Sequence, residues 1–299
     1  MKIFVTGATG LVGRSLCAEL TSRGHAVTGL SRRPAASAGL PAGVKVVQGD
    51  PARPGPWQDA LAGSDACVHL AGEPVAAGRW TPARKAAIEA SRVDSTRLVA
   101  GVIAAGGPGV LVCGSAVGFY GTRGDEVLDE ASAAGEGFLA DVCKRWEAAA
   151  APAAARARLV LLRTGIVLAR DGGALPKLVL PFKVFAGGPL GDGRFWQPWI
   201  HLADEVGLIA FALEDGRVAG PLNASAPEPV TNRDFAAALG AVLHRPSFMP
   251  APAAAIRLAV GEMAAVVLAS QRMMPKKALA LGYRFRFPSL EPALRDLLR

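Results

Sequence analysis

Residues 1–13 read MKIFVTGATGLVG and predict a strand, a glycine turn and the start of a helix. The run Lys2–Thr6 is short, apolar and β-branched, as in a buried strand. Gly7 can adopt the backbone angles of the turn, Gly10 leaves room for a pyrophosphate, and Gly13 lets the helix pack closely on the strand. Because N–H groups at a helix start bind phosphate, the stretch predicts a dinucleotide site. A glycine turn without a ligand is disfavoured by its place directly after a strand.

Length and composition are those of a large globular protein. The chain has 299 residues, of which 51% are hydrophobic, enough for one large domain or two smaller ones. Lys2 leads directly into the first strand, so we expect no signal peptide. The longest apolar stretch, Ala251–Ala269, is interrupted by Arg257 and Glu262 and predicts a buried amphipathic helix, not a membrane span. We therefore expect a cytoplasmic protein with no membrane partner.

Cysteine and histidine usage predicts neither a metal site nor disulfides. The four cysteines are widely spaced, without the paired spacing of metal ligands: Cys17, Cys67, Cys113 and Cys143. The four histidines are scattered as well. Buried free thiols in a reducing cytoplasm are the simplest explanation.

The basic charge balance leaves two interpretations of the partner. The net charge is +8 and the pI about 9.7, which nucleic-acid binding would explain. No basic run or aromatic–basic alternation supports that interpretation, since the arginines are spread over the whole chain. A cleft for an anionic cofactor, together with ordinary surface arginines, explains the charge better. We expect a small-molecule substrate, no nucleic acid, and a monomer or homodimer.

Strands alternate with helices through the first half of the chain. Strands are predicted at residues 2–6, 26–30, 44–48, 66–70, 110–115 and 159–164, and helices at 14–23, 82–105 and 138–151. The alternation predicts a doubly wound parallel sheet, a Rossmann domain of class α/β, over residues 1–165.

The alternation of strand and helix patterns ends after residue 165. Glycine-rich loops separate helical patterns at 202–214, 232–243 and 271–281, and 283–287 looks like a strand. Residues 166–299 therefore predict a smaller, mostly helical domain. Whether that domain is separate from the first or interleaved with it stays open.

Several segments together resemble the extended short-chain dehydrogenase/reductases: residues 6–13 (TGATGLVG), 47–50 (VQGD) and 69–72 (HLAG). Others are similar to an atypical branch, the epimerase family proteins of family 39U type: residues 72–74 (GEP), 79–81 (RWT), 91–92 (SR), 114–115 (GS), 119–121 (FYG), 146–147 (WE), 163–168 (RTGIVL) and 199–201 (WIH). Residues 248–297 resemble that branch's C-terminal domain of unknown function. The resemblance implies an NADP-binding oxidoreductase or epimerase, and its family name points to nucleotide sugars.

The end of the second strand indicates which nucleotide binds. NAD binders carry a carboxylate there for the ribose 2′-hydroxyl, whereas residues 30–33 read LSRR. A hydroxyl and a guanidinium suit a 2′-phosphate, so NADP is favoured over NAD. A solvated loop arginine is the alternative for Arg32. The predicted cofactor-binding residues are Gly7, Thr9, Gly10, Leu11, Val12, Ser31, Arg32, Leu70, Ala71, Gly72 and Arg92.

Arg92 enters this set through the resemblance, which implies that it faces the cofactor phosphates. An ion pair on the helix surface is the alternative. Leu70, Ala71 and Gly72 enter because they end the fourth strand, where small residues let the backbone pass close to the cofactor.

The catalytic tyrosine of the wider superfamily is missing. Its members use a serine and a Tyr-x-x-x-Lys motif, in which the lysine lowers the pKa of the tyrosine. The corresponding helix, 138–147, contains no tyrosine, and Leu139 and Cys143 stand where tyrosine and lysine are expected. Lys144 is one residue out of register, which is about 100° around a helix.

Ser115 and Tyr120 are the remaining catalytic candidates, because both follow the fifth strand near the expected nicotinamide position. Tyr120 as a packing residue is the alternative. A nucleophilic role for Cys143 is disfavoured, since nothing marks a base for it. We expect His201 to be structural, bound to a backbone carbonyl. Tryptophans at positions 80, 196 and 199 could wall an apolar pocket or simply pack in the core.

Two functions stay open from the sequence. One is an NADP-dependent oxidoreductase, or an epimerase that works by transient hydride transfer. The other is a catalytically degenerate, NADPH-dependent redox sensor or interaction protein, which the missing tyrosine favours.

Overall fold

Seven parallel strands form the central sheet in the computed structural model, which describes residues 1–299 apart from the side chain of Ser37. In spatial order they are β3 (Lys45–Gln48), β2 (Ala26–Ser31), β1 (Lys2–Thr6), β4 (Ala66–His69), β5 (Val110–Ala116), β7 (Arg158–Thr164) and β12 (Gly220–Ala224). All neighbours pair in parallel. The predicted doubly wound Rossmann sheet is confirmed, and its strand order reverses between β1 and β4, where such sheets bind ligands.

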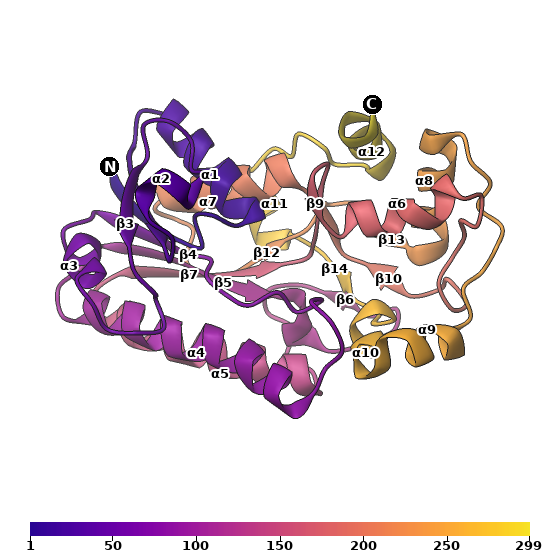
Figure 1. The fold of residues 1–299 in the computed structure, drawn as a ribbon, viewed down its shortest axis with the longest axis horizontal. Helices are drawn as coiled ribbons and strands as arrows, with labels where there is room; N and C mark the ends of the chain where they lie inside the picture. Colours follow the sequence, from indigo (N-terminus) through magenta and orange to yellow (C-terminus); the bar gives the residue numbers. More distant parts are fainter.

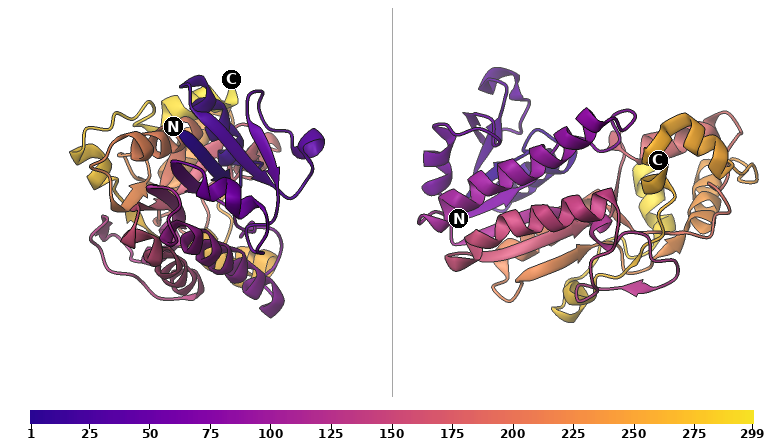
Figure 2. Two further views of the ribbon diagram at one scale, coloured as in Figure 1. Left: turned by 90° about the vertical axis from the view of Figure 1, so that its left-hand side faces the viewer. Right: turned by 90° about the horizontal axis from the view of Figure 1, so that it is seen from below.

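Helices cover both faces of this sheet (Figure 1). On one face lie α3 (Trp57–Ala62), α4 (Pro82–Ala104) and α5 (Phe138–Ala150). On the other face lie α1 (Leu11–Ser22), α7 (Leu202–Glu214) and α11 (Lys276–Ala280). Figure 2 shows α4 and α5 side by side across their face, and the two helices contact each other along their length. None of the helices in the described chain combines the length and apolar character that a bilayer crossing requires.

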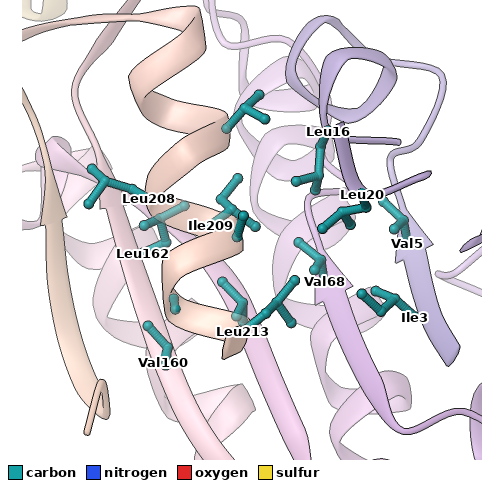
Figure 3. Packing of buried hydrophobic residues seen from close by; sticks show 14 of the residues in the cluster. Ile3, Val5, Leu16, Leu20, Val68, Val160, Leu162, Leu208, Ile209 and Leu213 are labelled. Atoms are coloured by element: carbon teal, nitrogen blue, oxygen red, sulfur yellow. The ribbon is translucent and has the colours of Figure 1, made fainter. Parts of the chain in front are cut away.

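The main core lies between the sheet and the layer of α1 and α7 (Figure 3). Alternate residues of a strand point to opposite faces, so Ile3 and Val5 of β1 meet Leu16 and Leu20 of α1. Phe4 points the other way and stacks on Trp57, with ring centroids 6.3 Å apart. Each such fully buried side chain contributes roughly 1.5–3 kcal/mol to folding.

The chain leaves the sheet after β7 and builds a second lobe. Its first elements are β8 (Ile166–Ala169), β9 (Gly172–Gly173), α6 (Leu175–Lys183), β10 (Trp196–Gln197) and β11 (Trp199–His201). The chain then returns to the sheet through α7 and β12 before it adds β13 (Val230–Thr231), α8 (Asn232–Leu243) and α12 (Leu290–Leu298) to the second lobe. Residues 202–224 therefore belong to the Rossmann layers, although they lie beyond the expected boundary at residue 165.

Short elements complete the connections: α2 (Ala35–Ala38), η1 (Val117–Tyr120), β6 (Val127–Leu128) and η2 (Ala151–Ala155).

The expected buried helix at Ala251–Ala269 is wrong. The segment forms α9 (Ala253–Val260), η3 (Gly261–Met263) and α10 (Ala264–Val267). Gly261, at φ +64°, ends α9 with a backbone conformation that favours glycine. The segment lies at the surface, and the Leu258 side chain is 80% exposed. Apolar residues in the sequence predict burial, but they do not show whether another layer packs on them.

Two expectations at the C-terminus are also wrong. Residues 271–281 do not form one helix, because β14 (Arg272–Met273) pairs in parallel with β6 and Pro275 precedes α11. Residues 283–287 form no strand, since the N–H groups of Arg286 and Phe287 donate to the Asp204 carboxylate, at 2.7 and 2.8 Å. Strand β12 is not predicted from the sequence, because Gly220 and Pro221 are residues that strands disfavour and they take up its first two positions.

Candidate nucleotide and substrate site

The glycine turn after β1 fits tightly around its own backbone and leaves one side open. Gly7 has φ +66°, and a Cβ there would lie 2.7 Å from the Leu70 carbonyl carbon. A Cβ at Gly13 would lie 2.2 Å from the Gly7 oxygen, so α1 packs directly on the turn. A Cβ at Gly10 would meet only the Gly7 oxygen, at 3.2 Å. Gly10 also begins α1 without a side-chain cap, so the first N–H groups of that helix face the open side.

A cavity of about 450 Å³ lies against this turn, at the carboxyl ends of the strands. Seven predicted cofactor-binding residues line it: Gly7, Thr9, Gly10, Arg32, Leu70, Ala71 and Gly72. Lining residues outside the predicted set include Gly49, Asp50, Glu73 and Ser91. Gly49 and Asp50 directly follow β3, and that place at the carboxyl edge of the sheet could have identified them from the sequence.

Ser31 and Arg32 differ in how they meet this cavity. The Arg32 side chain is 73% exposed, and its Nη1 lies 3.7 Å from Glu73 Oε1. The Ser31 side chain is buried, and its hydroxyl accepts a hydrogen bond from the Arg33 N–H at 3.0 Å. Arg32 is therefore the side chain that can reach a ligand, while Ser31 holds the loop that carries it.

Leu11 and Val12, which were also predicted to bind the cofactor, are not among the residues that line this cavity. A Cβ at Gly172 would lie 3.1 Å from Leu11 Cδ1, so the Leu11 side chain packs against the β8–β9 hairpin. Val12 packs on the main core. Both residues stand in the first turn of α1, where N–H groups have no partner one turn earlier in the helix.

The structure does not bring Arg92 into the cavity. Its Nη1 donates to the carbonyl oxygens of Glu73 and Ile88, both at 3.0 Å, and its guanidinium lies 5.2 Å from the Trp146 ring centroid. Burial lowers the pKa of Arg92. Neither a phosphate contact nor a surface ion pair describes this arginine, because its role here is to hold the loop of residues 72–74 beside the cavity.

A buried polar chain supports the same loop, and sequence reasoning missed it. Thr6 Oγ1 lies 2.6 Å from His69 Nδ1, and His69 Nε2 lies 3.1 Å from Ser95 Oγ. The Ala71 N–H donates to Thr6 Oγ1 at 3.3 Å. Burial lowers the pKa of His69 to about 4, so the ring is neutral at physiological pH and acts as a structural hydrogen-bonding group.

A second cavity, of about 700 Å³, lies at the carboxyl ends of β5 and β7. Its walls come from the end of β5 with η1, from the start of α5, from the link between β7 and β8, and from residues 262–271. Trp80 and Trp196 line it, which is the pocket alternative for these two tryptophans, together with Leu139 at the position expected for tyrosine. Trp199 does not, because it is 1% exposed in the core.

Helix α5 stands where the superfamily carries its Tyr-x-x-x-Lys motif. The α5 residues that line this cavity, Phe138, Leu139 and Ala140, have no titratable side chain. Cys143 is buried, and its thiol donates to the Ala116 oxygen at 3.8 Å. Burial raises its pKa to about 12, which argues against a nucleophilic thiolate. Lys144 points away and pairs with Asp141 at 2.7 Å.

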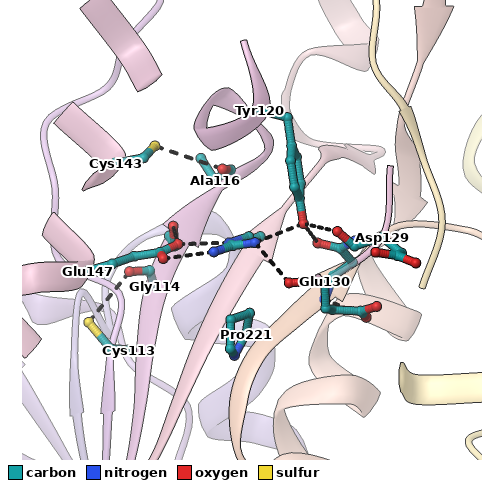
Figure 4. Close-up of polar contacts among 12 residues, drawn as sticks. Cys113, Gly114, Ala116, Tyr120, Asp129, Glu130, Cys143, Glu147 and Pro221 are labelled. Carbon is teal, nitrogen blue, oxygen red and sulfur yellow. Dashed lines mark hydrogen bonds and ion pairs between the residues drawn. The ribbon is translucent and has the colours of Figure 1, made fainter. Parts of the chain in front are cut away.

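Ser115 and Tyr120 belong to a buried polar cluster with Glu147 and Arg163, in which Figure 4 shows Tyr120 and Glu147. The Ser115 hydroxyl donates to Glu147 Oε1 at 2.6 Å, and Glu147 also pairs with Arg163. The Tyr120 side chain is fully buried, and its hydroxyl donates to Asn223 Oδ1 at 2.6 Å and accepts from Arg163 at 3.0 Å. Neither residue lines the second cavity, so their placement favours the packing alternative over proton transfer to a substrate.

Thr164 lines the second cavity, and its hydroxyl is hydrogen-bonded to a buried carboxyl group, that of Glu205. The Thr164 hydroxyl donates to Glu205 Oε1 at 2.8 Å. Glu205 is 1% exposed, and its Oε2 has no hydrogen-bond partner among the described residues. Burial raises the pKa of Glu205 to about 8. Nothing in the sequence marks Glu205 as unusual, because an acidic residue in the first turn of a helix is ordinary.

His201 is structural, but in another way than expected. Its Nδ1 accepts from the Ala203 N–H at 3.0 Å and so caps α7, and its ring stacks on Phe287 with centroids 3.9 Å apart. It therefore binds a backbone N–H, not a carbonyl. The described residues contain no cluster of histidine, cysteine and carboxylate groups able to hold a metal ion, and the four cysteines are buried free thiols.

Comparison with known proteins finds matches over almost all of the chain. Residues 3–224 match the NAD dependent epimerase/dehydratase family, and residues 251–297 match a domain of unknown function, DUF1731. The Arabidopsis thaliana "Epimerase family protein SDR39U1 homolog, chloroplastic" is 40% identical over 100% of this chain and 87% of its own length. Human epimerase family protein SDR39U1 is 36% identical over 100% of both chains.

Solved structures with this fold include proteins described with nucleotides. Human SDR39U1 (isoform 2), crystallised with NADPH, has a TM-score of 0.87 and 35% identity and covers 99% of each chain. The nucleoside-diphosphate sugar epimerase from Corynebacterium glutamicum has a TM-score of 0.79 and 37% identity, over 99% of this chain and 58% of that one. A UDP-glucuronic acid 4-epimerase from Bacillus cereus, at 17% identity and TM-score 0.81, shares the fold.

Proposed function

This chain belongs to the NAD dependent epimerase/dehydratase family, among the epimerase family proteins SDR39U1, and from that premise we propose that it is an NADP(H)-dependent oxidoreductase or epimerase. The observation that carries the proposal is the pair of cavities at one edge of the sheet. Gly7, Thr9 and Gly10 border the first, and the ends of β5 and β7 border the second. A dinucleotide bound along this edge has its phosphates at the first and its reacting ring at the second.

The residues present fit NADP(H). The open side of Gly10 and the helix start suit the pyrophosphate, and the exposed guanidinium of Arg32 suits a 2′-phosphate. No carboxylate follows β2 at residues 30–33 to hold a free ribose hydroxyl. The human relative crystallised with NADPH supports the same assignment.

The chain's own part in the reaction is to position a substrate and exclude bulk water. The bound nicotinamide supplies or accepts the hydride. Leu139, Val117 and Ile166 line the second cavity and keep bulk water from the reacting atoms. Thr164 lines that wall, but its hydroxyl already donates to Glu205 Oε1, so a carbonyl oxygen that gains charge takes its proton from a water molecule admitted beside the substrate. The name of one relative suggests a nucleotide sugar as substrate.

A second candidate is a redox sensor that binds NADPH without turning over a substrate. The observation in its favour is that Leu139 and Cys143 occupy the expected tyrosine and lysine positions, while the Ser115 and Tyr120 hydroxyls are held inside the protein. Such a protein would use the bound nucleotide to change its affinity for a partner.

One experiment separates these functions. NADPH deuterated at C4 is incubated with the protein and a panel of ketones, aldehydes and nucleotide sugars, and mass spectrometry follows deuterium into the products. Transfer to any member of the panel supports the oxidoreductase. NADPH binding without transfer supports the sensor, and the absence of NADPH binding in a titration contradicts both.

We keep the cytoplasmic location and the monomer or homodimer as parts of this proposal. Four buried thiols suit a reducing compartment, and the Arabidopsis relative described as chloroplastic indicates that compartments differ within the family. Fractionation with light scattering tests both points.

A further inference from the structure

Charged side chains are scarce around the second cavity. Of the described residues that line it, three carry charge: Lys85, Glu136 and Glu262. Lys85 is ion-paired with Glu262, so the single lining cation is already neutralised. The set has one positive and two negative charges, which repels a diphosphate and leaves it no cationic partner.

The remaining wall is mostly apolar. Aromatic and aliphatic side chains come from six separate parts of the chain: Trp80, Val117, Phe138 with Leu139, Ile166, Phe195 with Trp196, and Val266 with Val267. Trp80 and Phe138 meet edge to face, with ring centroids 5.0 Å apart. The Trp80 N–H donates to the Val75 oxygen at 3.0 Å, so that polar atom is already satisfied. Apolar walls with few polar groups favour an apolar ligand, since an unpaired polar group loses its water there.

Residues 253–267, which we call the cover segment, close one side of this cavity. Ala265, Val266 and Val267 line it from α10. Arg79 holds the segment by donating to the carbonyl oxygen of Ala259 at 3.2 Å, and the Lys85–Glu262 ion pair joins it to the start of α4. Figure 1 shows α9 and α10 near the ends of α4 and α5. The cover segment therefore contributes mostly apolar surface, and its one charged lining residue, Glu262, is paired with Lys85.

Arg272 is a candidate for an anion contact beside the cavity, since its Nε has no hydrogen-bond partner among the described residues. Its guanidinium lies 4.4 Å from the Trp196 ring centroid, and Arg272 is not among the lining residues. Stacking on an indole stabilises a guanidinium without a carboxylate partner.

We propose that the second cavity takes an uncharged carbonyl compound with a mostly apolar body, or the corresponding alcohol, rather than a nucleotide sugar. This inference rests on the proposed hydride-transfer function. In the reduction, the carbonyl carbon gains the hydride from the reduced cofactor, the π electron pair moves to the oxygen, and the oxygen takes a proton from a water molecule, which leaves as hydroxide; the products are the alcohol and the oxidised cofactor. A volume of about 700 Å³ holds the reacting ring together with a substrate of two or three fused rings or a medium alkyl chain.

The test measures binding to the NADPH complex by calorimetry, so that it does not depend on turnover. The uncharged probes are 2-acetylnaphthalene, menadione and 2-undecanone, and the charged probes are UDP-glucose and UDP-glucuronic acid. We expect at least one uncharged probe to bind at least tenfold more tightly than both charged probes. Tighter binding of a charged probe, or failure of all three uncharged probes to bind, overturns the proposal. Loss of NADPH binding itself would instead contradict the proposed function.

Two matched variants place the probe in the cavity. Val267→Glu puts a carboxylate on the lining, and we expect it to weaken binding of the uncharged probe at least tenfold, a larger loss than any in NADPH affinity. Leu258→Glu adds the same charge to the same segment at an exposed position, and we expect no change. Equal effects of both variants overturn the placement. Binding of UDP-glucose that Arg272→Gln abolishes would assign the site to a nucleotide sugar.

Discussion

The guanidinium of Arg163 and the carboxylate of Glu147 form a bidentate ion pair inside the protein, with Nε–Oε1 and Nη2–Oε2 both at 2.9 Å. The two side chains are 4% and 10% exposed. The pair joins β7 to α5 and anchors the hydroxyls of Ser115 and Tyr120 (Figure 4). The residues that sequence reasoning favoured for proton transfer are therefore bound into a structural cluster.

Breaking this pair should destabilise the fold strongly. Glu147→Gln leaves the Arg163 charge buried without its partner, which costs about 3–5 kcal/mol of unfolding free energy in urea titrations. The double variant Glu147→Leu/Arg163→Met removes both charges, and we expect it to recover part of the loss. A loss below about 1 kcal/mol for Glu147→Gln would mean that water reaches the pair.

Tyr120→Phe should behave as a stability variant. It removes the donor to Asn223 Oδ1 and leaves that buried oxygen unpaired, which costs about 1–3 kcal/mol. NADPH affinity should not change. Tyr283→Phe, which removes a hydroxyl that donates to the Asp204 oxygen in another part of the fold, is the control. A fall in kcat of about 100-fold at unchanged stability would restore Tyr120 as an acid/base.

The glycine turn should separate binding from stability. Gly10→Val should abolish binding of NADPH and NADH while the protein stays folded, because its side chain enters the open side of the turn. Gly13→Ala should instead lower stability by about 1–3 kcal/mol, because its Cβ would lie 2.2 Å from the Gly7 oxygen.

Gly101→Ala is the matched control for the glycine variants. Gly101 lies within α4, nothing lies within 4 Å of an added Cβ, and the substitution should stabilise the helix by about 0.5–1 kcal/mol. Unchanged NADPH affinity in folded Gly10→Val would show that the turn does not hold the cofactor. Calorimetry and thermal unfolding together give both readouts.

Arg32 should decide between the two nucleotides. Arg32→Ala should reduce the preference for NADPH over NADH by about 1–3 kcal/mol while NADH affinity stays the same. Arg33→Ala removes the neighbouring exposed charge and is the control for nonspecific attraction. Equal losses for both variants would assign the preference to general charge rather than to Arg32.

Glu205 should make the protein less stable as pH rises. An ordinary ion-paired carboxylate has the opposite effect and adds stability as pH rises. Its pKa is about 8 in the folded protein, against 4.5 for an ordinary glutamate, so the folded state holds a proton that the unfolded chain releases between these values. The free energy of unfolding should therefore fall as pH rises from 4.5 to 8, at up to about 1.4 kcal/mol per pH unit.

Glu205→Gln keeps the shape and the hydrogen bond to Thr164 but does not ionise in this range. We expect it to lose this part of the pH dependence and to exceed the parent protein in stability at pH 8. Urea titrations at several pH values measure the difference. Parallel pH profiles for the two proteins would mean that Glu205 ionises in water in the folded state.

The sequence alone predicted six of the seven strands of the Rossmann sheet and the glycine turn that borders the first cavity. Periodicity and glycine spacing are local properties, and they fixed β1, α1 and the turn of Gly7 and Gly10. The absence of a carboxylate at residues 30–33 is equally local, and so was readable without a structure.

Only the tertiary structure decided where the long-range partners lie. Asn223 returns from β12 to hold Tyr120, and Glu205 comes from α7 to meet Thr164, over sequence separations of 103 and 41 residues. Burial of the cover segment likewise depends on whether another layer packs on it, and none does at Leu258. Side-chain periodicity records which face of an element is apolar, but the partner of that face, and the pKa of a group behind it, depend on chain segments that meet only after folding.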